Sequence, residues 1–180
     1  MNPLDPDTKQ IFTWIGALTV GMQTTERIVD LAMTFVFPAK EKLTLQMLER
    51  LERQQRSRTL GRLAGQLRER VNLHPELVQL LDNFVEHRNQ LAHRVHDIPG
   101  WNLETAEGRK VAIDFLDQLQ KEDLKVLQIF LGALIVWENQ HKLGIVKDLP
   151  PEIIKIFPEI PAFKVVVNAP VFAKQDIAPE

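Results

Sequence analysis

The apolar residues of this chain recur every three or four positions, and this spacing limits the possible fold more than any other feature. Between residues 11 and 36 an apolar side chain falls on one helical face at almost every turn, and only Thr25 interrupts the series. The spacing matches the 3.6-residue period of an α-helix, not the alternation of a strand. It predicts a long helix with Asp5 as N-cap and Pro6 as first residue, ending near Pro38. The apolar stripe comprises Ile11, Ile15, Leu18, Met22, Val29, Ala32 and Val36.

The same spacing predicts four further helices, over roughly residues 43–55, 59–71, 75–96 and 105–144. Pro75 suits the first turn of one of them, and Thr105 is the expected N-cap of the last. Asp123 interrupts the apolar stripe of the last helix, so we expect a kink or solvent exposure near residues 121–125. Gly61 and Gly65 share one helical face, where they either admit a close helix contact or are merely tolerated.

The C-terminal segment differs in composition from the rest of the chain. Six of the 11 prolines lie between residues 150 and 180, and no strand pattern appears before residue 160. The only strand-like run is Phe163 to Val167. We interpret the segment as an extended arm that packs on the body or on a partner, with a disordered tail as the alternative. The predicted fold is all-α, an up-and-down bundle of four to five helices over residues 1–146 with an extended Pro-rich tail over 147–180.

Composition and charge exclude several classes of protein. The 180 residues suit one domain, and a net charge of −2 excludes a polycation that binds nucleic acid by bulk attraction. The absence of cysteine excludes disulfides and cysteine-based zinc sites. The N-terminus lacks the basic start of a signal peptide, and the apolar run at 11–22 is too short to cross a bilayer. We therefore expect a cytoplasmic protein that does not enter a membrane.

One arginine lies where a charge is costly. Arg88 continues the stripe formed by Leu77, Leu81, Phe84, Leu91 and Val95. A buried guanidinium needs a carboxylate, a phosphate or a water-filled cavity, and the structural alternative is an ion pair with a glutamate of a neighbouring helix. His93 lies about 140° from Arg88 around the helix and shares a second, partly apolar face with Asn89 and His96. Two such faces predict packing against both the same bundle and another chain.

The pattern of Arg88, Asn89 and His93 resembles the motif of the HEPN superfamily. Its members carry an arginine, often followed by asparagine or histidine, and a histidine four to six residues later. The helical context supports the resemblance, which covers about residues 7–144 and leaves out the Pro-rich arm. It implies a bundle that dimerises around the motif helices, so that two copies of the motif meet in one composite cleft.

The HEPN resemblance also implies a function. Many HEPN proteins are metal-independent endoribonucleases that act as toxins or in phage defence. Others bind RNA or a protein partner without cutting, which is the alternative function here. Some are encoded beside a nucleotidyltransferase antitoxin, which is a candidate partner.

The residue types suit this chemistry independently of the family. In RNA the 2′-hydroxyl can attack the neighbouring phosphate, and a histidine such as His93 can remove its proton or protonate the leaving oxygen. The guanidinium of Arg88 would stabilise the charge on the phosphoryl oxygens. Asn89 would orient His93 or bind a phosphate oxygen. Four of the five histidines lie within residues 74–96 without a paired carboxylate–histidine set, so we expect no metal and no cofactor.

A second set of residues bears on RNA binding. Residues 50–70 hold seven arginines and two glutamates, Glu52 and Glu69, which gives a local charge of +5. These arginines would either neutralise the phosphates of RNA or form a solvated helix surface. No aromatic residue interleaves with them, so base stacking is not expected. His87 and His96 are otherwise expected at solvent or an interface. The candidate RNA-binding residues are Arg94, His96, Arg62 and Arg58.

Overall fold

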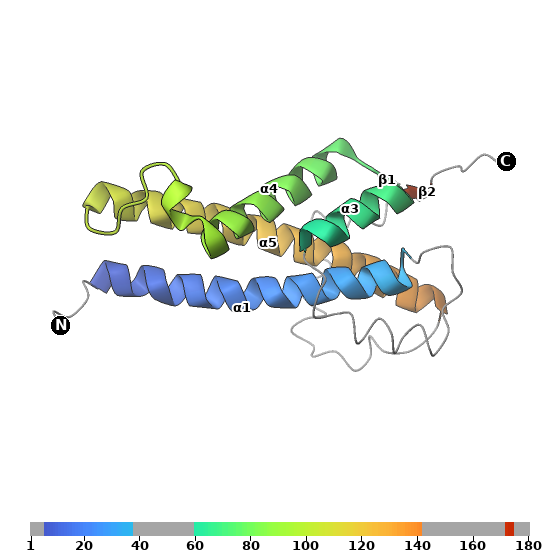
Figure 1. Ribbon diagram of the computed structural model, residues 1–180. Coiled ribbons are helices and arrows are strands. Elements are labelled where there is room, and N and C mark those ends of the chain that lie inside the picture. The colour runs from blue at the N-terminus through green and yellow to red at the C-terminus, as the bar shows by residue number, and fades with distance from the viewer. Residues whose placement is uncertain (1–5, 38–59, 142–171, 175–180) are drawn as a thin grey trace.

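A computed structural model describes residues 6–37, 60–141 and 172–174. These residues form almost entirely helices, so the predicted all-α fold class is confirmed (Figure 1). The four longer helices are α1 (Pro6–Phe35), α3 (Leu60–Arg70), α4 (Pro75–His93) and α5 (Ala106–His141). The shorter elements are a 3₁₀ turn, η2 (Val95–Asp97), and two strands, β1 (Val71–Leu73) and β2 (Phe172–Lys174). The predicted N-cap Asp5, the helix at 43–55 and the strand-like run at 163–167 lie outside the described residues.

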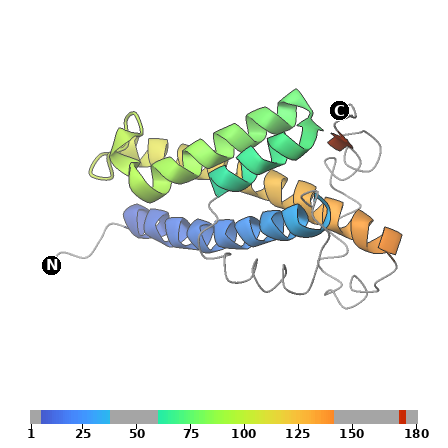
Figure 2. The ribbon, with the colours of Figure 1, turned by 45° about the vertical axis from the view of Figure 1, so that its right-hand side comes forward.

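The two longest helices lie side by side and run in the same direction, as Figures 1 and 2 show. Near their C-terminal ends the rings of Phe35 and Trp137 are 5.3 Å apart. The shorter helix α4 runs back along α5 in the opposite direction, and α3 covers the end of the bundle at which α4 begins (Figure 2). Of the helices that the structure describes, none combines the length and the apolar character that a bilayer crossing needs.

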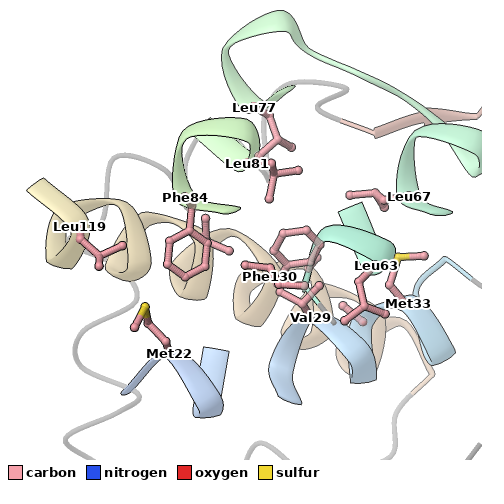
Figure 3. Close-up of a cluster of buried hydrophobic side chains, with 14 of the residues drawn as sticks. Met22, Val29, Met33, Leu63, Leu67, Leu77, Leu81, Phe84, Leu119 and Phe130 are labelled. Atoms are coloured by element: carbon pink, nitrogen blue, oxygen red, sulfur yellow. The ribbon is translucent and has the colours of Figure 1, made fainter. Parts of the chain in front are cut away.

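The hydrophobic core lies where α1, α3, α4 and α5 meet. Figure 3 shows Phe84 of α4 and Phe130 of α5 directed into it, together with Leu63 and Val29. Both phenylalanines are fully buried. The predicted stripe of α1 faces this core, and Thr25, which interrupts the stripe, is also fully buried. Burial of this apolar surface is the main stabilising contribution to the fold.

The loop before α5 fixes how that helix begins. The Thr105 hydroxyl accepts a hydrogen bond from the Gly108 amide at 3.1 Å, which confirms Thr105 as the N-cap. A Cβ atom at Gly108 would lie 2.0 Å from the carbonyl oxygen of Asn102, so only glycine fits there. Gly100, with φ of 78°, uses the left-handed conformation open to glycine. The other two glycines singled out above, Gly61 and Gly65, make no such close approach, so they are tolerated residues.

The helix α4 is shorter than predicted, and this is a correction. It ends at His93 instead of about His96, because Arg94 leaves the helical conformation with φ of −140° and ψ of 37°. Residues 95–97 then form the turn η2. His96 therefore does not share a helical face with His93.

A second correction concerns the strands. The segment predicted as the end of a helix at residue 71 instead begins β1, which pairs antiparallel with β2. Val71 faces Lys174 across this two-stranded sheet, and Leu73 faces Phe172. The expectation of no strand before residue 160 was therefore wrong. The pairing joins residues about a hundred positions apart, and local periodicity carries no information about such a contact.

Candidate active site

Arg88 forms an ion pair with a glutamate of a neighbouring helix, as the structural alternative predicted. Its Nη2 atom lies 2.9 Å from Oε1 of Glu26 on α1, and the side chains are 24% and 20% exposed. Its Nη1 atom donates to Oδ1 of Asn89 at 3.1 Å. Among the described residues no donor N–H points at Glu26 Oε1 in hydrogen-bonding geometry, although this atom is buried. The contact with Arg88 is therefore ionic, and the charge on the α4 stripe is neutralised within the chain.

The ion pair lies in the wall of a cavity between α1 and α4, here called the groove. Its volume is about 320 Å³, at the lower end of the range for small-molecule sites. Arg88 and Glu26 are the charged residues of its lining, and four of the other six are apolar. The lining comprises Ile15, Thr19, Met22, Gln23, Glu26, Arg88, Leu91 and Ala92.

A second acid lies next to Glu26, on α5. Asp123 is 6% exposed, and α5 stays helical through it, so the exposure expected for this residue was wrong. Burial raises the pKa of the Asp123 carboxyl, a hydrogen bond with the Thr25 side chain opposes this shift, and the Glu26 carboxylate adds to it. Its Oδ1 atom is buried and accepts no hydrogen bond from the described residues. Thr25 and Asp123, the polar residues that interrupt the apolar stripes of α1 and α5, thus face each other.

This burial predicts that Asp123→Asn stabilises the protein at neutral pH. The folded-state pKa of Asp123 lies above its ordinary value of 3.8, so the folded protein holds the proton more tightly than the unfolded chain. In the wild type the contribution of Asp123 to the free energy of unfolding therefore falls as the pH rises from 3.8 through the raised pKa. Thermal unfolding should show a higher Tm for Asp123→Asn at neutral pH and a shrinking difference on acidification.

The matched control is Asp114→Asn, which neutralises an exposed carboxylate on the same helix and should change Tm little at either pH. A lower neutral-pH Tm for Asp123→Asn than for the wild type would contradict this account.

The structure also shows a histidine–carboxylate pair that the sequence did not indicate. Nδ1 of His87 lies 2.8 Å from Oε2 of Glu122, whose side chain is 3% exposed. Gln118 donates to the other oxygen of Glu122 at 2.8 Å, and the rings of Phe115 and His87 form a T-shaped contact with centroids 5.4 Å apart. His87 was expected at solvent or an interface, but it connects α4 to α5. A histidine oriented by a buried carboxylate is suited to proton transfer.

His93 is exposed at the last position of α4 and does not line the groove. The structure therefore brings Arg88 and Asn89 together but does not bring His93 to them within one chain. This agrees with the offset of about 140° between Arg88 and His93 on the helix.

The candidate RNA-binding residues are scattered. Arg94 forms an ion pair with Glu86 at 2.9 Å, His96 is exposed in η2, and Arg62 is exposed on α3. Arg58 lies outside the described residues. Two other arginines of the basic segment contribute to the fold: Arg70 donates to the carbonyl oxygens of Met33 and Phe37, and Arg68 pairs with Asp82. In the part of the chain that the structure describes, no group of three or more His, Asp or Glu could hold a metal ion.

Comparisons with protein-family models, with curated proteins and with solved structures gave no match for this chain.

Proposed function

We propose that this protein is a metal-independent endoribonuclease of the HEPN type, acting in the cytoplasm as a homodimer in a toxin–antitoxin or phage-defence role. The observation that carries the proposal is the position of Arg88. Its guanidinium lies in the wall of the groove, with Asn89 bonded to it and His93 exposed on the same helix. An imidazole can transfer the protons and a guanidinium can stabilise the phosphoryl charge when RNA is cleaved without a metal.

The proposed reaction uses the 2′-hydroxyl of RNA as the nucleophile. His93 removes the hydroxyl proton or protonates the leaving 5′-oxygen, and a P–O bond to the 2′-oxygen replaces the bond to the 5′-oxygen. Arg88 stabilises the negative charge on the phosphoryl oxygens. The products are a 2′,3′-cyclic phosphate and a free 5′-hydroxyl. DNA lacks the nucleophile and is not a substrate.

A second copy of the chain supplies the missing part of the site. One chain leaves His93 outside the groove, so Arg88 of one protomer must meet His93 of the other. The solvent side of α1 carries Phe12 and Val20, which are 50% and 65% exposed. Exposed apolar side chains of this size favour contact with another surface. A nucleotidyltransferase antitoxin is the further partner that we propose.

The ion pair between Arg88 and Glu26 favours a second candidate function. A guanidinium that is neutralised within the chain needs no phosphate partner. The alternative is a non-catalytic HEPN-like module that binds RNA or a protein partner and uses α4 for dimerisation.

The two functions predict different results when purified protein is incubated with RNA in the presence of a metal chelator. The ribonuclease proposal predicts cleaved RNA with 2′,3′-cyclic phosphate ends and intact DNA of the same sequence. Varied RNAs that remain intact, with protein free of antitoxin, would support the non-catalytic module instead.

A further inference from the structure

The groove carries one charge of each sign and is neutral as a whole. Arg88 of α4 and Glu26 of α1 face each other, with Nη2 and Oε1 2.9 Å apart. The other residues that line the groove are uncharged, and four of them are apolar. A ligand that enters the groove therefore meets a fixed pair of opposite charges and not a single charge.

Both members of the ion pair can take a further polar partner. Glu26 Oε1 is buried and accepts no hydrogen bond from the described residues. A guanidinium carries several N–H donors, and in the described part of the chain Arg88 makes one hydrogen bond, to Asn89, beside its ionic contact with Glu26. A buried acceptor without a donor costs free energy, so a ligand N–H group at Glu26 would stabilise the groove.

The pairing of charges decides which class of ligand fits. A simple anion on Arg88 would compete with Glu26 for the guanidinium and would place two negative charges together. A simple cation on Glu26 would do the converse with Arg88. A ligand with an ammonium and a carboxylate close together can lie alongside the pair with reversed polarity, so that every charge has an opposite neighbour and none is left unpaired.

We propose that the groove is a binding site for a small zwitterion, an α-amino acid with an aliphatic side chain. Its carboxylate binds Arg88, its ammonium binds Glu26, and its side chain packs against Ile15 and Leu91. Gln23, one turn before Glu26 on α1, adds an amide that can bond either head group. The volume of about 320 Å³ suits a ligand of this size.

This binding site goes beyond the proposed function and has a consequence for it. A guanidinium that holds the ligand carboxylate is not available to a phosphoryl group. If the protein cleaves RNA as proposed, the bound zwitterion therefore slows cleavage in competition with RNA.

Titration of the wild-type protein with L-leucine, followed by NMR of the methyl groups, tests the proposal. The signals of Ile15 and Leu91 should shift and saturate with a Kd of about 1 mM or tighter. The methyl signals of Leu124, which is exposed on α5, should not move and serve as the control.

Two analogues of leucine test whether both charges are needed. Isocaproate keeps the aliphatic chain and the carboxylate but lacks the ammonium, and isoamylamine keeps the chain and the ammonium but lacks the carboxylate. Each should bind at least about tenfold more weakly than leucine, because it leaves one charge of the groove without an added partner. This series uses the wild-type protein, so it does not depend on the folding of any variant.

Glu26→Gln tests the residue that binds the ammonium. It should weaken leucine binding by about tenfold or more and remove the preference for leucine over isocaproate, because the negative charge of the groove is gone. The matched variant Glu107→Gln neutralises an exposed carboxylate in the first turn of α5 and should keep the wild-type values. Circular dichroism compares the folds of the two variants.

The absence of a saturable shift with leucine would overturn the proposal, as would isocaproate binding to the wild type as tightly as leucine. The result is independent of RNA cleavage. Leucine binding by a protein that leaves RNA intact would uphold this inference and count against the ribonuclease. RNA cleavage by a protein that does not bind leucine would do the reverse.

Discussion

Replacing His93 with alanine is expected to lower the rate of RNA cleavage by about 10²–10⁴-fold, the usual contribution of a general acid or base. The same change should leave the free energy of unfolding within about 0.5 kcal/mol of wild type, because the side chain is exposed at the end of α4. Single-turnover cleavage of a labelled RNA gives the rate, and urea unfolding followed by circular dichroism gives the stability.

His141 provides the matched control for this variant. It is also an exposed histidine at the last position of a helix, α5, and it should tolerate alanine with little loss of cleavage. A cleavage rate that is equal in the wild type and His93→Ala would remove His93 from the mechanism. The non-catalytic module would then be the better account.

Arg88→Ala should lower both the rate of RNA cleavage and the stability of the fold, whereas His93→Ala should lower only the rate. Cleavage is lost because the phosphoryl charge is no longer stabilised. Stability should also fall, by about 1–3 kcal/mol, because the Glu26 carboxylate loses its partner. A large loss of stability without any effect on RNA would support a purely structural role for Arg88.

Replacing Phe84 with alanine should cause the largest loss of stability, about 3–5 kcal/mol. The ring is fully buried where α4 meets α1 and α5, so its removal leaves a cavity that the surrounding helices fill only in part (Figure 3). Phe84 also lies one helical turn before Arg88. Cleavage requires the folded chain, so the rate should fall in proportion to the fraction of protein that unfolds. Urea unfolding midpoints at a constant m-value measure the effect.

Leu124→Ala is the control for Phe84→Ala. The side chain of Leu124 is 45% exposed on α5, and its truncation should change stability by less than about 1 kcal/mol. A loss for Phe84→Ala no larger than that for Leu124→Ala would contradict the position of the core.

The sequence predicted α1, α3, α4, α5 and the position of Arg88 because these depend on local periodicity. Five of the seven residues of the α1 stripe are buried and the other two, Ile15 and Val36, are partly buried, and Arg88 of α4 faces α1. The alternative expectation for Arg88 was an ion pair with a glutamate of a neighbouring helix, but the sequence did not identify that glutamate as Glu26. That choice depends on which turn of α1 lies against which turn of α4, and a pattern within one helix carries no information about it.

The acidic residues were harder to interpret from sequence. An aspartate on an apolar stripe, such as Asp123, is expected to be exposed because burying an unpaired carboxylate costs free energy. The structure buries it against Thr25, the one polar residue in the stripe of α1, so the two interruptions explain each other. The strand at residues 71–73 was missed because it forms by pairing with residues 172–174, far outside any local window. The end of α4 was placed at about residue 96, whereas the helix ends at His93.

Mixing two inactive variants tests most directly whether catalysis needs two chains. We predict that Arg88→Ala and His93→Ala, each inactive alone, recover cleavage when their subunits exchange, because one side of the mixed dimer then combines an intact Arg88 with an intact His93. Random exchange makes about half of the dimers mixed, so roughly a quarter of the wild-type rate should return. A mixture that stays inactive after subunit exchange has been demonstrated would contradict the shared site.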